Sequence, residues 1–213
     1  MLTTTGSMID TMMIAPLGET TVGAVGLCAQ FSSLMFAGYW GFFGGGMLFF
    51  SQYWGAQDDD GIDHSYGLTL TCMMIVGLTF GAFAIFAPET VMKLYTDKES
   101  IQVIGAEYLR IIGFGYPVQV FSMAMSALLR STERVRIPLF ASIASVASNI
   151  FLNWVFIYGK FGLPEMGVRG AALATVIARF TELVLVIVWT HTHTNKVPFA
   201  QGVYRSLRIP GTL

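Results

Sequence analysis

Residues 20–57 read TTVGAVGLCAQFSSLMFAGYWGFFGGGMLFFSQYWGAQ, and no charged side chain occurs between Glu19 and Asp58. Further uncharged runs occupy residues 65–88, 111–129 and 137–159. A helix needs roughly 20 residues to cross a hydrocarbon core about 30 Å thick, and each run approaches or exceeds that length. The chain is therefore predicted to be an all-helical integral membrane protein, because unpaired backbone amides are not tolerated in lipid.

The composition of the 213 residues supports this prediction. Hydrophobic residues make up 54% and charged residues only 12%, against about 25% charged residues in soluble domains. The net charge of −1 argues against a nucleic-acid partner. The chain has no Gly-rich phosphate loop, Ser/His/Asp set or metalloprotease signature, so we predict neither an enzyme nor an organic cofactor. The expected partners are the lipid bilayer and a small-molecule substrate.

Six helical segments are predicted, at about residues 2–15, 22–57, 63–87, 100–129, 138–159 and 167–190. The first is too short to span a membrane, and we expect the chain to be truncated at its start. A short amphipathic stretch, 89–95, follows the third segment. In the fourth, Pro117 comes after Gly113 and Gly115, which predicts a kink.

The loops predict how the helices are oriented. Positive residues favour the cytoplasmic side, and six lie on one side of the predicted bundle against four on the other. The more positive side holds Arg130, Arg134, Arg136, Lys196, Arg205 and Arg208, and the other holds Lys93, Lys98, Lys160 and Arg169. We therefore predict a multi-pass protein of the cytoplasmic (inner) membrane, with the 130–137 loop and a linker at 191–213 in the cytoplasm.

Asp10 is the first candidate functional residue. It lies in MIDTMMI, residues 8–14, which is apolar apart from Asp10 and Thr11. A carboxyl at membrane depth is costly and usually faces a cavity where it has a function, such as binding a cation on one side of the membrane and releasing it on the other. The alternative is a solvated aspartate in a frayed helix.

Asn149 and Asn153 form the second candidate group. Their spacing of four residues puts both amides on one helix face. They could bond a carboxyl such as Asp10 or offer oxygens to a sodium ion. The alternative is that they join helices without a role in transport.

Two pairs of opposite charge are spaced three residues apart, the spacing at which helical side chains meet. Arg179 and Glu182 are predicted to form a structural ion pair, with a gating contact as the alternative, and Glu107 with Arg110 a structural pair. The glycines of the 41–45 GxxxG motif predict close helix packing.

No metal site is predicted. Asp58–Asp60 followed by Asp63 resembles the start of a calcium loop, but Asp63 stands where the loop needs glycine and Thr69 where it needs glutamate. These acids are better explained as helix caps.

Five segments in order resemble the multidrug and toxic compound extrusion (MATE) exporters. They are MIDTMMIAPLG (8–18), VGAVGL (22–27), SQYWGAQD (51–58), ALLRST (127–132), and NIFLNWVFIY with GLPEMGVRGAALAT (149–158 and 162–175). The resemblance implies one six-helix lobe of a twelve-helix transporter, with the first helix truncated and the C-terminal lobe missing.

The resemblance also implies roles for individual residues. The first-helix aspartate of the family takes part in cation coupling, which corresponds to Asp10, and fifth-helix polar residues that cooperate with it correspond to Asn149 and Asn153. Some members have an aspartate at the second of these positions; Asn153 cannot titrate, so Asp10 is the one expected proton carrier. Thr175 and Tyr116 are further candidates for the cavity lining.

Three hypotheses follow. The first is an antiporter lobe in which inward flow of H⁺ or Na⁺ drives export of amphiphilic or cationic organic compounds. The second is a flippase for a lipid-linked substrate, whose cavity would be rich in Arg and Lys; here the sequence predicts Arg179 at most. The third is an inactive structural fragment.

Overall fold

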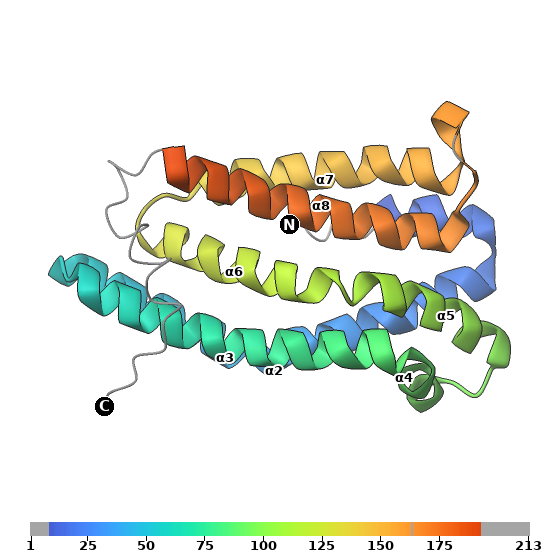
Figure 1. Ribbon diagram of the computed structural model, residues 1–213, viewed down its shortest axis with the longest axis horizontal. Coiled ribbons are helices and arrows are strands. Elements are labelled where there is room, and N and C mark those ends of the chain that lie inside the picture. The colour runs from blue at the N-terminus through green and yellow to red at the C-terminus, as the bar shows by residue number, and fades with distance from the viewer. Residues whose placement is uncertain (1–8, 163, 193–213) are drawn as a thin grey trace.

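The computed structural model describes residues 9–162 and 164–192, and all regular structure within these ranges is helical (Figure 1). Residues 9–14 are helical and lead into the short 3₁₀ helix η1 (Ala15–Leu17). The remaining elements are α2 (Glu19–Ala56), α3 (Asp59–Phe86), α4 (Pro88–Tyr95), α5 (Glu99–Ile112), α6 (Gly115–Ser131), α7 (Arg136–Ile157), η2 (Lys160–Gly162) and α8 (Gly167–Thr192).

The predicted fold class, an all-helical membrane bundle, is confirmed. Within the described ranges, α2, α3, α7 and α8 are each long and apolar enough to cross a membrane, and α5 with α6 makes a fifth candidate as one bent span. The predicted first segment corresponds to the helical residues 9–14 and extends into residues 1–8, which lie outside the described part. Of the linker predicted at 191–213, residues 191–192 continue α8 and the others lie outside the described residues.

The kink predicted in the fourth segment appears as a 50° bend between α5 and α6. Pro117 has no N–H to donate to the carbonyl four residues earlier, and its ring clashes with that carbonyl. The residue in question is Gly113, where the helix breaks. A methyl group on Gly113 would lie only 2.9 Å from Ala84 Cβ, so the missing side chain also lets α3 pack against the bend.

The acidic start of α3 is a helix cap, as predicted. Asp58 Oδ1 accepts a hydrogen bond of 3.0 Å from the Gly61 backbone N–H, and Asp59 and Asp60 lie in the first turn, where negative charge favours the helix dipole. Gln57 reverses the chain between α2 and α3 in a left-handed conformation, with φ 58°.

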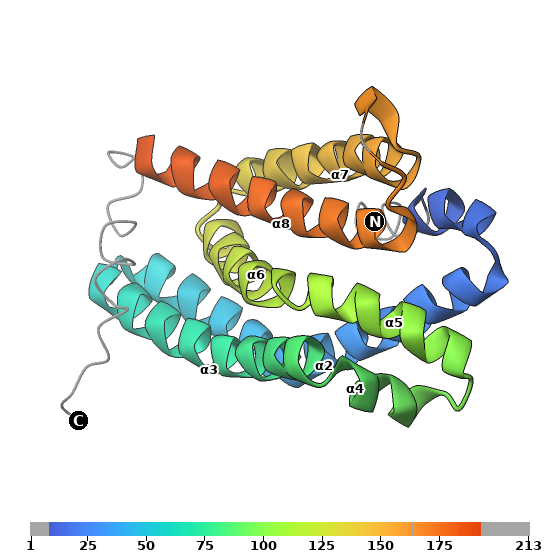
Figure 2. The ribbon, with the colours of Figure 1, turned by 45° about the vertical axis from the view of Figure 1, so that its right-hand side comes forward.

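The helices pack as two pairs with α6 between them. Figures 1 and 2 show α7 beside α8, and α2 beside α3, while α6 contacts α2, α3 and α8. Large apolar side chains such as Leu48, Leu68, Phe86 and Phe140 are mostly exposed on the outside, as lipid-facing residues would be. Nothing lies within 4 Å of a methyl group built on Gly41 or Gly45, so the packing predicted from this motif does not occur within the described residues.

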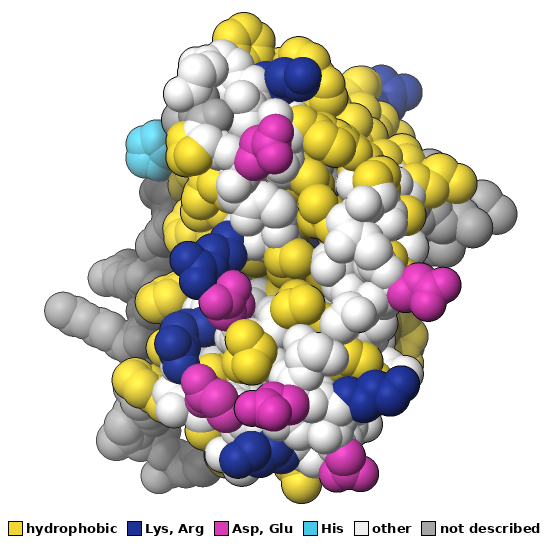
Figure 3. Space-filling model, turned by 90° about the vertical axis from the view of Figure 1, so that its right-hand side faces the viewer, with side chains coloured by type: hydrophobic (Ala, Val, Ile, Leu, Met, Phe, Trp, Pro, Cys, Tyr) yellow, Lys and Arg dark blue, Asp and Glu magenta, His cyan; other side chains and the backbone are white. Residues whose placement is uncertain are grey.

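Charged side chains gather at the end of the bundle formed by α4, α5 and the start of α8 (Figure 3). Two exposed ion pairs lie here: Arg110 to Glu89 at 2.7 Å, and Arg169 to Glu107 at 2.6 Å. The prediction that Glu107 pairs with Arg110 is therefore wrong. Acids on neighbouring helices offer each guanidinium better geometry, including two hydrogen bonds from Arg169 to Glu107.

Candidate functional site

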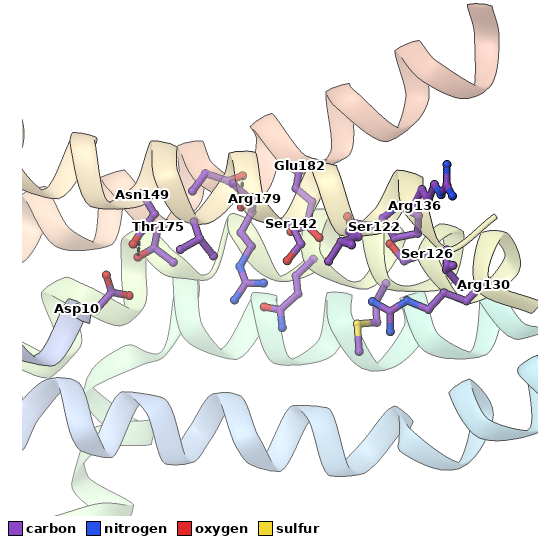
Figure 4. Close-up of a pocket in the computed structure, with 18 residues that line it drawn as sticks. Asp10, Ser122, Ser126, Arg130, Arg136, Ser142, Asn149, Thr175, Arg179 and Glu182 are labelled. Carbon is purple, nitrogen blue, oxygen red and sulfur yellow. Dashed lines mark hydrogen bonds between the residues drawn. The ribbon is translucent and has the colours of Figure 1, made fainter. Parts of the chain in front are cut away.

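A cavity of about 590 Å³ lies between α6, α7 and α8, with Asp10 at one end. Figure 4 shows polar side chains along its length, from Asp10 through Arg179 and Glu182 to the arginines near the α6–α7 loop. Its polar lining consists of Asp10, Gln119, Ser122, Ser126, Arg130, Arg136, Ser142, Ser145, Asn149, Thr175, Arg179 and Glu182.

Asp10 and its segment are held against α7 by Asn153 of that helix and by Tyr158, the residue directly after it. Its Oδ1 accepts a hydrogen bond of 2.6 Å from Asn153 Nδ2, across 143 residues of sequence. Three residues after Asp10, the Met13 carbonyl accepts a bond of 3.1 Å from the Tyr158 hydroxyl. The two contacts are three residues apart on the short segment and five residues apart at the end of α7, so together they fix the position of this segment.

The hydrogen bonds continue from Asn153 along the cavity wall. Asn153 Nδ2 also donates to Asn149 Oδ1 at 3.3 Å, and Asn149 Nδ2 donates to Thr175 Oγ1 at 3.4 Å. Both asparagines are buried, with 1% of Asn153 and 8% of Asn149 exposed. The structure thus brings Asp10, Asn149, Asn153 and Thr175 into one bonded set, which we call the Asp10 cluster.

The Asp10 cluster contains oxygen atoms that could bind a cation. Both hydrogens of the Asn153 amide are used, yet its Oδ1 is buried without a hydrogen-bond partner. A carboxylate oxygen and an unpaired amide oxygen suit a proton or a hard cation such as sodium. Within the described residues, no three His, Cys, Asp or Glu side chains come together as they would around a transition metal.

Arg179 and Glu182 both line the cavity, but the predicted ion pair between them is not formed. The ion pairs that join two described residues through Lys or Arg are the two at the α4–α5 end. Spacing of three residues puts both side chains on the cavity face of α8, where the charge of Arg179 acts on Glu182 and on Asp10, and the charge of Arg130 acts on Glu182 as well. The two charges therefore act on each other without a direct ion pair.

Tyr116 does not line the cavity, contrary to prediction. It is 1% exposed, and its hydroxyl lies 2.8 Å from Ser32 Oγ on α2. Position 116 belongs to the first turn of α6, beside the bend, where α2 rather than the cavity is the neighbour.

Several lining residues were missed by the sequence reasoning, although a pattern could have found them. Polar residues recur on α6 at positions 119, 122, 126 and 130, and on α7 at positions 142, 145, 149 and 153. Both sets follow helical spacing, so each forms one polar stripe along a mainly apolar helix. The stripes add Arg130 to the lining, and Arg136 at the start of α7 joins it, so the expectation of Arg179 as the single arginine was wrong.

Comparison with known proteins identifies the family. Residues 1–155 match the family model MatE. The chain belongs to the MatE family. The resemblance inferred from the five sequence segments is thereby confirmed, and the Asp10 cluster lies largely within the matched residues.

Individual MatE relatives agree. The probable multidrug resistance protein YoeA of Bacillus subtilis is 26% identical over 209 residues, which cover 98% of this chain and 45% of YoeA. The probable multidrug resistance protein NorM of Thermotoga maritima is 42% identical over 93 residues, 43% of this chain and 20% of NorM. A crystal structure of MATE in the bent conformation superimposes with a TM-score of 0.80 at 23% identity, covering 91% of this chain and 42% of that one. The chain spans about half the length of these relatives.

Proposed function

We propose that this chain is one lobe of a cation-coupled antiporter that exports amphiphilic or cationic organic compounds across the cytoplasmic membrane. The observation that carries the proposal is the Asp10 cluster, in which a carboxylate at one end of the cavity is bonded to a buried amide with an unpaired oxygen. The relatives described as multidrug resistance proteins support the direction and the substrate class.

In this proposal Asp10 is the coupling residue, and H⁺ or Na⁺ is the coupling ion. An ion shifts a conformational equilibrium only by its difference in affinity for the two states. Asp10 sits on a short segment that Asn153 and Tyr158 hold, so movement of that segment would change the distance to Asn153 and hence the affinity for the ion. Asn149 and Asn153 orient the carboxyl, and Thr175 extends the same wall.

The proposal includes a second lobe as a partner. Transporters built from repeats place their sites at the interface between the repeats and move one against the other. The cavity described above is walled by the helices of one lobe, and half the relatives' length lies beyond this chain. We expect the 213 residues alone not to transport, and a second six-helix lobe, or a second copy of the chain, to complete the cavity.

Reconstitution tests the proposal. The chain is placed in liposomes alone, and in parallel together with a second six-helix lobe. A pH gradient and a sodium gradient are then imposed separately, and export of a fluorescent dye is followed. Ion-driven flux with both lobes and none with one lobe is the expected result. Flux independent of either gradient would refute cation coupling, and flux from the pure chain would favour a dimeric half-transporter.

A further inference from the structure

The middle of the cavity contains a second polar region with a different character from the Asp10 cluster. Arg179 is half-buried, and its guanidinium forms neither a hydrogen bond nor an ion pair with any residue that the structure describes. A guanidinium carries five N–H donors and no acceptor, and charged groups at membrane depth are normally paired. Among the described residues, Asp10 and Glu182 line the same cavity, but neither carboxylate forms a direct ion pair with Arg179.

Ser122 gives a second and independent indication at the same place. Its side chain lines the cavity from α6 with only 4% exposure, and its Oγ has no hydrogen-bond partner. Buried polar atoms without partners are rare in folded proteins. Gln119 lies one turn earlier on the same face of α6 and adds an amide group. Three side chains able to donate hydrogen bonds therefore face the cavity here.

The other charges of the cavity surround this region. Asp10 lies at one end, bonded to Asn153, and Arg130 and Arg136 lie at the other (Figure 4). Glu182, one turn from Arg179 on α8, is the acid nearest to it in sequence. The lining thus carries three arginines against two acids. Between the charges, Met123, Val135, Leu139 and Val146 provide apolar wall.

We propose that Arg179, Gln119 and Ser122 bind the anionic group of an amphiphilic compound, such as a carboxylate, sulfonate or phosphate, while the apolar wall holds its hydrocarbon part. The inference rests on the proposed function, because it names the substrate class that this cavity takes. Planar guanidinium groups match the geometry of such oxyanions. The negative charge of Glu182 repels the anion and limits its affinity. Removing that charge should therefore strengthen binding, whereas removing Arg179 should weaken it.

Binding of two matched probes tests the proposal. The 213-residue chain is placed in phosphatidylcholine nanodiscs and titrated with dansyl-aminohexanoate or with the dansyl-aminohexyl trimethylammonium analogue, and binding is read by fluorescence anisotropy against empty nanodiscs. The carboxylate probe should bind more tightly. Arg179→Gln should weaken it by about tenfold or more, as expected for loss of a charged hydrogen bond, and Arg179→Lys by less.

Two further variants complete the test: one should change probe binding in the opposite direction, and the other is a control. Glu182→Gln should strengthen carboxylate binding several-fold, because it removes a like charge. Arg110→Gln makes the same chemical change as Arg179→Gln at an exposed residue paired with Glu89, and should leave binding unchanged. If Arg179→Gln fails to fold, the change in carboxylate binding caused by Glu182→Gln still shows whether the site prefers an anion.

Several outcomes would overturn the anionic site: tighter binding of the ammonium probe, weaker carboxylate binding in Glu182→Gln, or no binding of either probe. Adding phosphatidylglycerol to the nanodiscs distinguishes two sources of the anion. Displacement of the carboxylate probe assigns the site to a membrane lipid, and lack of displacement to a soluble amphiphile. Because this assay uses no ion gradient, its result is separate from failure of ion-driven export by the two-lobe assembly.

Discussion

The two polar regions of the cavity differ in how their hydrogen bonds are satisfied. In the Asp10 cluster the side chains bond to one another, from Asp10 through Asn153 and Asn149 to Thr175. In the middle, Arg179 and Ser122 have no such partners among the described residues. The cluster keeps its geometry by itself and needs only a small ion, whereas Arg179 and Ser122 leave donor groups that a larger ligand could bind.

Replacing the carboxylate should have the largest effect on the Asp10 cluster. Asp10→Asn keeps an oxygen that can accept the Asn153 hydrogen bond but removes the charge that binds a cation. We expect ion-driven dye export by the two-lobe assembly to fall to background, while the melting temperature changes little. Asp59→Asn, the same change in the exposed first turn of α3, is the control. Export at the unaltered rate from Asp10→Asn would remove Asp10 from the mechanism.

The loss of export on replacing each asparagine should depend on the strength of the hydrogen bonds that it makes. Asn153→Leu removes a 2.6 Å bond to a carboxylate, and charged hydrogen bonds contribute about 1.5–3 kcal/mol, so we expect ion-driven export at limiting ion concentration to fall by about 10–100-fold. Asn149→Leu removes neutral bonds of 3.3 and 3.4 Å, which predicts a loss of only a few-fold. Equal losses would mean that the cluster acts through packing rather than through the Asp10 bond.

The arrangement of the Asp10 cluster could largely be predicted from the sequence, whereas that of the middle region could not. Asn149 and Asn153 share a helix face because of their spacing, and a buried carboxyl needs partners, so their meeting with Asp10 could be foreseen across 143 residues. The position of the bend followed in the same way, since Pro117 acts on the residue four positions before it.

The middle region could not be predicted by local pairing. The spacing of Arg179 and Glu182 makes a bond possible, but which partner a long side chain takes depends on the charges that other helices bring. The same reason explains why Glu107 bonds Arg169 and Arg110 bonds Glu89. Gln119 and Ser122 were overlooked because each is unremarkable alone, and only the spacing shared by the polar residues of α6 and α7 indicates a cavity wall.

Moving α8 relative to α7 should affect the two regions unequally. A methyl group on Gly170 would lie 2.8 Å from the backbone carbonyl carbon and oxygen of Phe156, so Gly170→Ala must separate the helices and should cost about 1–3 kcal/mol of stability. The Asn149–Thr175 bond crosses this interface, whereas Arg179 depends on α8 alone. We therefore expect ion-driven export to decline more than binding of the carboxylate probe.

A matched glycine provides the control for this variant. Nothing lies within 4 Å of a methyl group on Gly44, and alanine is favoured over glycine in a helix by up to about 1 kcal/mol. Gly44→Ala should melt at the same temperature as the unaltered chain or slightly higher. A melting temperature for Gly170→Ala as high as that of Gly44→Ala would contradict the close contact between α7 and α8.

The smallest expected effect compares two serines of the same cavity. Ser145 Oγ donates a bond of 2.9 Å to the Ala178 carbonyl, while Ser122 Oγ has no partner. Ser145→Ala should therefore lower the free energy of unfolding by about 0.5–1.5 kcal/mol. Ser122→Ala loses no bond and removes an unsatisfied buried oxygen, so it should leave stability unchanged or raise it slightly. The same change should weaken binding of the carboxylate probe a few-fold. Thermal melting and probe titration of both variants measure this. If Ser122→Ala were the more destabilising of the two, the Ser122 hydroxyl would stabilise the fold, and ligand binding would not be needed to explain its position.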